Sequence, residues 1–262
     1  MTTIMIVMAV LGAVLYAVIN VLNRKIDAYI LSQEDYEEDV DGTMTKEEKK
    51  AFKQKQQEEK EIFKLPFARL GSRYYKEKTL RCILIIIFGA GISAAAAWKY
   101  GVSAGLVFTF LTFAIMTLQG LIDFDTTELP FELNVLIYFL AILSFMFWKE
   151  YSIKERIIGA LCITVPMILL DLAIPNAFGW GDIKLLFGTG ALFGWKIQVA
   201  GFFMGCIIQA LISLIFVITK KKNWKSHLPF GPMLCLGIMT AVLVGELIIN
   251  WYIDSIMLAM ES

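Results

Sequence analysis

Residues 179–184 read Gly-Trp-Gly-Asp-Ile-Lys and open two apolar runs, residues 183–195 and 199–219. These runs predict membrane helices, because the hydrocarbon core of a bilayer is crossed by roughly 20 predominantly apolar residues. A carboxylate and an amine at the start of such a segment are costly, and they therefore indicate a functional site. The two glycines remove side chains before Asp182, so that backbone or substrate can approach it closely. An aspartate that only caps a helix is the structural alternative.

The whole chain has the composition of a polytopic membrane protein. Of its 262 residues, 58% are hydrophobic, whereas soluble domains have about 45–50% apolar residues. Apolar blocks recur along the chain, and we expect an all-α membrane bundle of about eight transmembrane helices. The blocks are residues 2–22, 80–98, 102–122, 131–148, 157–173, 183–195, 199–219 and 230–252. The sixth block is short for a full crossing, which indicates a tilted or partial span, or one fused with the seventh.

The charged residues divide the chain into three expected regions. Residues 1–22 would form the first transmembrane helix, residues 23–79 a charged helical insert, and residues 80–262 the main helix bundle. No basic patch with interleaved aromatic residues occurs outside the insert, so a nucleic-acid partner is not expected.

The basic residues also predict an orientation. Lys and Arg gather in residues 24–81 and 220–225, and the positive-inside rule places both clusters in the cytoplasm. Following the spans along the chain puts Asp123 and Asp182 on this same side. The mixed-charge loop at residues 149–156 falls on the opposite side, and its three basic residues make it the weakest part of the assignment.

The insert contains a candidate calcium-binding loop at residues 37–48. It fits much of the EF-hand pattern, with a glycine at the sharp turn. The oxygen ligands would be Glu37, Asp39, Asp41, Thr45 and Glu48. The first position normally holds Asp, and no second loop pairs with this one, so an acidic turn leading into the helix expected at residues 47–61 is the favoured alternative.

The chemistry of Asp182 calls for a second carboxylate rather than a metal. Aspartyl proteolysis uses two carboxyl groups that share one proton. The chain has a single histidine, His227, and no Cys/His cluster, so the sequence does not predict a zinc site. The four cysteines stand singly in apolar segments and indicate core residues rather than ligands or disulfides; they are Cys82, Cys162, Cys206 and Cys235.

The second carboxylate is expected at the end of the third apolar block. Asp123 follows this block directly and therefore lies at the bilayer boundary. Asp125 and Glu128 are competing candidates, but they lie further from the helix end. Pro130 stops one element and helps to start the next span. Asp171, late in the fifth block, is another acid in apolar surroundings, and the sequence leaves its role open between structure and substrate binding.

Two motifs together resemble the type IV prepilin peptidase family, whose members are intramembrane aspartyl proteases of the GxGD type. They are Ile122-Asp123 with Leu129-Pro130, and Gly179-x-Gly181-Asp182-x-Lys184. Residues 190–195 and 229–232 also resemble the family, and the resemblance covers roughly residues 80–252. It implies that Asp123 and Asp182 form a catalytic dyad within the main bundle, supported by Gly179, Gly181, Lys184, Pro130 and Asp125.

The resemblance also implies a substrate and a location. The expected substrate is a prepilin or pseudopilin, whose N-terminal leader is cut at the cytoplasmic face of the bacterial inner membrane. Many bacterial members then methylate the new N-terminus with S-adenosylmethionine. Two departures matter: Phe131 stands where the family commonly has Asp, and the insert lacks the cysteine pairs that many members carry. Bound zinc is therefore not expected, methyl transfer is left open, and the oligomeric state is not indicated.

Three other interpretations compete with this one. Proteases of the presenilin or signal-peptide-peptidase kind carry Pro-Ala-Leu before the final span, where this chain has Gly-Pro-Met-Leu at residues 231–234. A proton- or cation-coupled transporter would bind its ion with membrane acids, but it would show paired inverted repeats and broken helices at mid-membrane. A structural scaffold would use the same acids only as helix caps.

Overall fold

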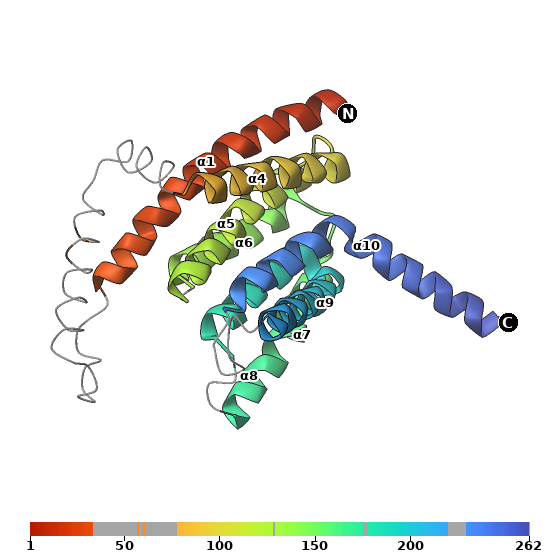
Figure 1. Ribbon diagram of the computed structural model, residues 1–262. Helices are drawn as coiled ribbons and strands as arrows, with labels where there is room; N and C mark the ends of the chain where they lie inside the picture. Colours follow the sequence, from red (N-terminus) through yellow and green to blue (C-terminus); the bar gives the residue numbers. More distant parts are fainter. Residues whose placement is uncertain are drawn as a thin grey trace. The chain divides into compact units, whose positions relative to one another are not determined.

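The computed structural model describes residues 1–33, 57, 60, 78–127, 129–174, 178–219 and 229–261. Within these residues the chain forms helices and no strand, which confirms the all-α prediction. The helices are α1 (Thr2–Gln33), α4 (Thr79–Tyr100), α5 (Ala104–Thr126), α6 (Phe131–Phe147), α7 (Ile153–Cys162), α8 (Thr164–Ala173), α9 (Trp180–Ile218) and α10 (Gly231–Glu261) (Figure 1).

Several of these helices are long and apolar enough to span a bilayer, as expected of a multi-pass membrane protein. By length and composition, five of the described segments meet this condition: Thr2–Ile30, Thr79–Tyr100, Ala104–Thr126, Ile153–Ala173 and Trp180–Phe216. The apolar helices Phe131–Phe147 and Gly231–Gly245 are shorter. The expected count of about eight spans is therefore not confirmed. One reason is that the sixth and seventh apolar blocks are fused in a single element, α9, which was one of the expected alternatives.

The expected insert is only partly described. Helix α1 continues past residue 22 and ends at Gln33, so its C-terminal part lies within the range assigned to the insert. Gln57 and Lys60 are helical. The five candidate calcium ligands and His227 lie outside the described residues. The three-region division of the chain stays a prediction.

Residues Ile6–Ala94 form one compact unit, which contains most of α1 and α4. The two helices approach closely where glycines leave room for a neighbouring side chain. A Cβ atom at Gly89 would lie 2.1 Å from the Tyr16 ring, and one at Gly12 would lie 2.3 Å from Ser93 Oγ. Larger residues at these two positions would force the helices apart.

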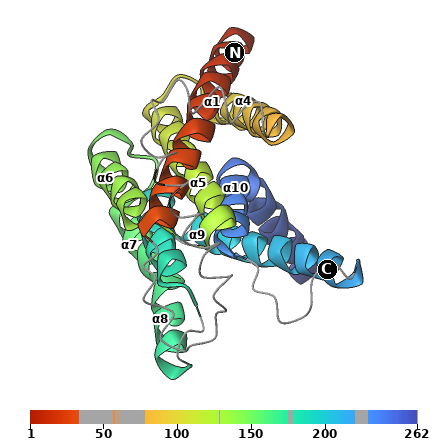
Figure 2. The same cartoon turned by 60° about the vertical axis from the view of Figure 1, so that its left-hand side comes forward.

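Met1–Met5 and Ala95–Ser262 form the other unit, in which α9 is the central element. Helix α9 packs against α6, α7 and α10, and α10 also packs against α5. Figures 1 and 2 show α9 and α10 running alongside each other. Glycines again allow the close packing: a Cβ at Gly190 would lie 2.1 Å from Gly159 O of α7, and one at Gly237 of α10 would lie 2.3 Å from Gly205 N of α9.

Helix α9 is interrupted at Gly194, whose backbone has φ 77° and ψ 171°. This region is open almost only to glycine. Buried polar side chains hold the two halves together across the interruption. Gln198 Nε2 donates a hydrogen bond to Leu186 O (2.9 Å), and Gln198 Oε1 lies 3.1 Å from Thr189 Oγ1.

Replacement of Gly194 with alanine is expected to lower the free energy of unfolding by about 1–3 kcal/mol, because a Cβ atom strains this backbone conformation. Thermal unfolding in detergent measures the effect. Gly245→Ala is the matched control, since a Cβ there meets ordinary contacts of 3.4 Å or more. Equal unfolding temperatures for Gly194→Ala and the wild type would contradict the assigned strain.

Near the interruption of α9, Arg156 connects the ends of three helices. It lies in the first turns of α7, and only 1% of its surface is exposed. Its guanidinium donates to Tyr151 O (3.2 Å), Trp148 O (2.6 Å), Leu192 O (3.2 Å), Ala191 O (3.4 Å) and the Ser144 hydroxyl. These acceptors belong to the end of α6, the connection to α7, and the end of the first half of α9. The backbone carbonyls that the two helix ends leave unpaired are thereby satisfied.

Candidate active site

Asp123 lies on the buried side of the last turns of α5, with 6% of its surface exposed. The helix ends because Thr127 adopts a left-handed conformation (φ 57°), from which its N–H donates to Asp123 O (2.8 Å). Asp125 in the same turn is exposed. This difference agrees with the helical period: residues two positions apart lie on different faces of a helix.

Asp182 lies in the first turn of α9, with 7% of its surface exposed. The turn is closed by a hydrogen bond from Ile183 N to Gly179 O (3.2 Å). A Cβ at Gly179 would lie 3.0 Å from Asp182 Oδ2, so a side chain there would press on the carboxylate. Asp182 thus lies at the start of α9, and the backbone at Gly179 passes close to its carboxylate.

The carboxylates of Asp123 and Asp182 lie near each other within the unit that contains Ala95–Ser262. The charge of Asp123 acts on the Asp182 carboxyl, so the groups lie close enough to interact electrostatically. Asp123 Oδ2 and Asp182 Oδ1 are buried, and neither has a hydrogen-bond partner in the described part of the chain. Since buried polar atoms are nearly always paired, two unpaired carboxylate oxygens indicate a place for a water molecule or a substrate group.

Three further residues, which the sequence analysis did not assign to the site, lie close to the dyad or to Gly181. A Cβ at Gly181 would lie 2.6 Å from Leu129 Cβ, and one at Gly231 would lie 2.6 Å from Asp123 Oδ2. Cys235, one turn after Gly231 in α10, lies within electrostatic range of both aspartates. Leu129 and Gly231 fall in segments that carry the family resemblance, whereas no sequence signal distinguishes Cys235 from the other cysteines.

Two of the expected supporting residues, Pro130 and Lys184, lie at the starts of α6 and α9. Pro130 precedes the first residue of α6 with φ −58°, as a helix start allows. Lys184 is half-buried, and its Nζ lies 4.8 Å from the centre of the Phe131 ring, a cation–π contact. The backbone oxygen of Lys184 accepts a hydrogen bond from Tyr138 Oη (2.9 Å), which ties α9 to α6.

Asp171 lies at the end of α8 and contacts the segment that leads into the site. Its Oδ1 accepts a hydrogen bond from Phe178 N (3.4 Å), one residue before Gly179. This contact makes Asp171 part of the support for the start of α9. Glu128, the other competing acid, lies outside the described residues.

No cluster of three or more His, Cys, Asp or Glu side chains that could hold a metal ion occurs among the described residues. The four cysteines are unpaired thiols. Cys82 and Cys235 are buried, and Cys162 and Cys206 are half-buried.

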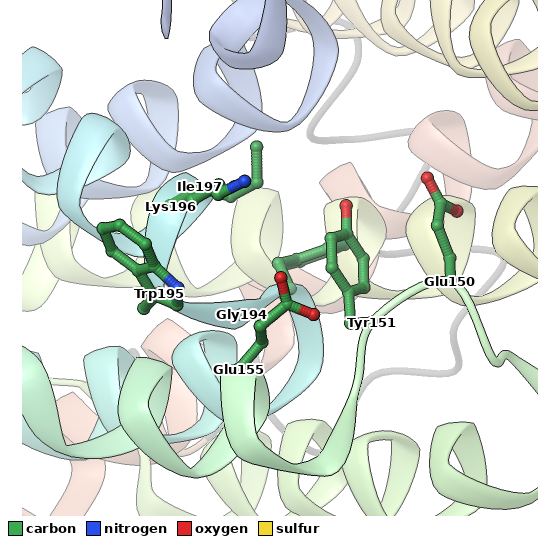
Figure 3. Close-up of a pocket in the computed structure, with 8 residues that line it drawn as sticks. Glu150, Tyr151, Glu155, Gly194, Trp195, Lys196 and Ile197 are labelled. Atoms are coloured by element: carbon green, nitrogen blue, oxygen red, sulfur yellow. The ribbon is translucent and has the colours of Figure 1, made fainter.

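A separate cavity of about 120 Å³ lies beside the interruption in α9. Figure 3 shows that it is bordered by Tyr151 and Glu155 on one side and by residues 194–197 on the other. Its acids already have partners: Glu150 accepts from Trp148 Nε1 (2.7 Å), and Glu155 accepts from Ser152 N (2.8 Å). The cavity contains neither aspartate of the dyad, and the change of helix direction at Gly194 accounts for it.

The segment that contains both aspartates is similar to a known protein family. The sequence model of the type IV leader peptidase family matches residues 110–214, a segment that contains both Asp123 and Asp182. The prepilin leader peptidase/N-methyltransferase of Legionella pneumophila is 28% identical over 168 residues, which cover 62% of this chain and 58% of that protein. The corresponding protein of Bacillus subtilis (strain 168) is 28% identical over 166 residues, covering 63% and 66%.

The protein of the same name from Pseudomonas aeruginosa is 27% identical over 194 residues, covering 71% of this chain and 63% of that protein. No solved structure matches the chain. In each of the three matches, the chain covers less than two thirds of the relative's own length. The resemblance to type IV prepilin peptidases is confirmed by these matches, which give the transporter alternative no support.

Proposed function

We propose that this chain is an intramembrane aspartyl endopeptidase that removes the leader peptide of type IV prepilins or pseudopilins. The observation that carries the proposal is the electrostatic proximity of Asp123 and Asp182, two buried carboxylates from helices far apart in the sequence. Each has a buried oxygen without a hydrogen-bond partner among the described residues. Its support is the family match, which spans both residues. Proteolysis by this route needs no metal ion.

In the proposed mechanism, the two carboxyl groups share one proton, because two close carboxylates cannot both ionise cheaply. The ionised group takes a proton from a water molecule held between Asp123 Oδ2 and Asp182 Oδ1. The water oxygen then attacks the scissile carbonyl carbon, and the protonated group donates its proton to the carbonyl oxygen. Proton transfer to the amide nitrogen then breaks the C–N bond, and the shared proton is restored. The pair titrates as a unit, not as two separate residues.

The residues around the dyad have supporting roles in this proposal. Gly179 lets an extended substrate backbone pass beside Asp182, and it is exposed, as an approach route requires. Leu129 fills the space where a side chain at Gly181 would stand, so Gly181 allows close packing at this point. The cation–π contact of Lys184 with Phe131 fixes the start of α9 against α6. Phe131 is the position at which the family commonly has an acid.

We also infer a location in the cytoplasmic membrane, with the dyad at the cytoplasmic face and the substrate helix entering from the lipid. The relatives' names include N-methyltransferase activity. Methyl transfer from S-adenosylmethionine would be a second reaction on the cleaved product, and it is separate from the chemistry of the dyad.

The proposal is tested with the full chain in proteoliposomes and a model prepilin. We expect the prepilin to lose its leader, and mass spectrometry of the product N-terminus reports the cut site and any methyl group together. A prepilin variant that lacks its leader is the control and should stay unchanged. An uncut prepilin, in liposomes where a known prepilin peptidase cuts it, would contradict the proposal.

A further inference from the structure

We propose that Gly231, the first residue of α10, is a positioning residue for the catalytic dyad, an inference that rests on the proposed peptidase function. Its lack of a side chain leaves the space that the Asp123 carboxylate occupies. The start of α10 would thus be a third component of the site, besides the end of α5 and the start of α9.

The first argument is steric. A Cβ atom at Gly231 would lie 2.6 Å from Asp123 Oδ2 and 3.1 Å from Asp123 Cγ. Carbon and oxygen atoms that are not bonded do not approach this closely without repulsion. The group that must yield is the end of a side chain, not a helix backbone. Even alanine at residue 231 would therefore displace the carboxylate while leaving the helices in place.

The second argument is that Gly231 cannot easily move away from Asp123. The first turn of α10 is closed by hydrogen bonds from Met233 N (3.1 Å) and Leu234 N (3.0 Å) to Phe230 O. Next to Gly231, Pro232 Cα lies 3.3 Å from the position of a Cβ at Gly120, which is on α5 one turn before Asp123. The backbones of α5 and α10 are thus in close contact at this level.

The third argument concerns charge. The backbone amide of Gly231 acts on the Asp123 carboxylate, as expected at a helix start, where N–H groups have no partner within the helix. The same carboxylate keeps Oδ2 unpaired on the side where a Cβ at Gly231 would stand. A side chain at residue 231 would therefore disturb the oxygen that the proposed mechanism uses.

Gly231→Ala is expected to lower kcat for prepilin cleavage about 100-fold, since a misplacement of about 1 Å at a reacting group costs roughly this factor. KM should stay within about threefold, because no substrate-binding group is removed. The pH dependence of kcat should change as well, because the variant disturbs one member of the shared-proton pair. Wild-type kcat and an unchanged pH profile would overturn the inference.

Two glycines of the same helix provide controls. Gly245→Ala should keep wild-type activity, because a Cβ there makes only ordinary contacts. Gly237→Ala should lose folded protein, because a Cβ there would lie 2.3 Å from the backbone nitrogen of Gly205. If the Gly231→Ala protein is folded and its KM is unchanged, its loss of kcat is not the result of a general packing defect.

A stability measurement tests the same contact without any activity assay. Gly231→Ala should lower the unfolding temperature when Asp123 is present, and it should have little effect in an Asp123→Ala background, where the carboxylate is gone. Equal shifts of the unfolding temperature in both backgrounds would overturn the inference. This test can be made even if Gly231→Ala is too unstable for an activity assay. If Asp123→Asn and Asp182→Asn still cleave prepilin, the proposed function fails. The coupling between Gly231 and Asp123 is decided separately, by the unfolding temperatures.

Discussion

Replacing either Asp123 or Asp182 with asparagine is expected to reduce leader cleavage by about 10³-fold or more. Asparagine has nearly the same shape as aspartate, but it can neither take a proton from water nor donate one as an acid. Because the two carboxyl groups act as a unit, the double variant should lose no more activity than either single variant. Single-turnover cleavage of a prepilin in proteoliposomes measures these rates.

Asp125→Asn is the matched control for this experiment. Asp125 lies in the same turn as Asp123 but is exposed, so its variant should keep activity close to that of the wild type. All variants should fold, since neutral asparagine is no more costly to bury than an ionised aspartate. Full activity in Asp123→Asn together with an inactive Asp125→Asn would move the second catalytic acid to residue 125.

Replacing Arg156 with alanine is expected to lower the free energy of unfolding by roughly 3–5 kcal/mol. The substitution leaves several buried acceptors without a donor, among them the backbone oxygens of Trp148 and Leu192. It also removes the cation–π contacts that the guanidinium makes with the rings of Trp148 and Tyr151. Thermal unfolding in detergent measures the loss.

Lys154→Ala is the control for Arg156, because Lys154 is a basic residue of the same helix that is exposed. It should leave the unfolding temperature unchanged. Arg156→Lys should rescue only part of the loss, since an ammonium group cannot reproduce the planar fork of donors. An Arg156→Ala protein as stable as the wild type would show that the helix ends do not depend on this side chain.

Much of the architecture was predictable from the sequence. The apolar blocks gave the all-α class and the approximate positions of the helices, because block length and composition are local properties. The count of spans was less predictable. The sixth and seventh blocks form the single element α9, interrupted at Gly194. Arg156, assigned from sequence to a loop, is a buried residue of α7.

The two aspartates of the candidate site could also be predicted, from their positions at the ends of apolar runs and from the resemblance of their motifs. The remaining parts of the site could not. Leu129 and Gly231 contact the groups around the dyad through the packing of α5, α9 and α10, and Cys235 approaches it from α10. Nothing in a single sequence states which helices touch, or at which level.

The sequence by itself determined that the chain forms a bundle of apolar helices with acids at their ends, because hydrophobicity and helix termination depend on neighbouring residues. Only the tertiary structure decided that Asp123, beside Gly231, lies within electrostatic range of Asp182, and that each carboxylate has a buried oxygen without a partner among the described residues. The physical reason is that glycines along α7, α9 and α10 set how closely the helices approach, and this approach brings distant residues together.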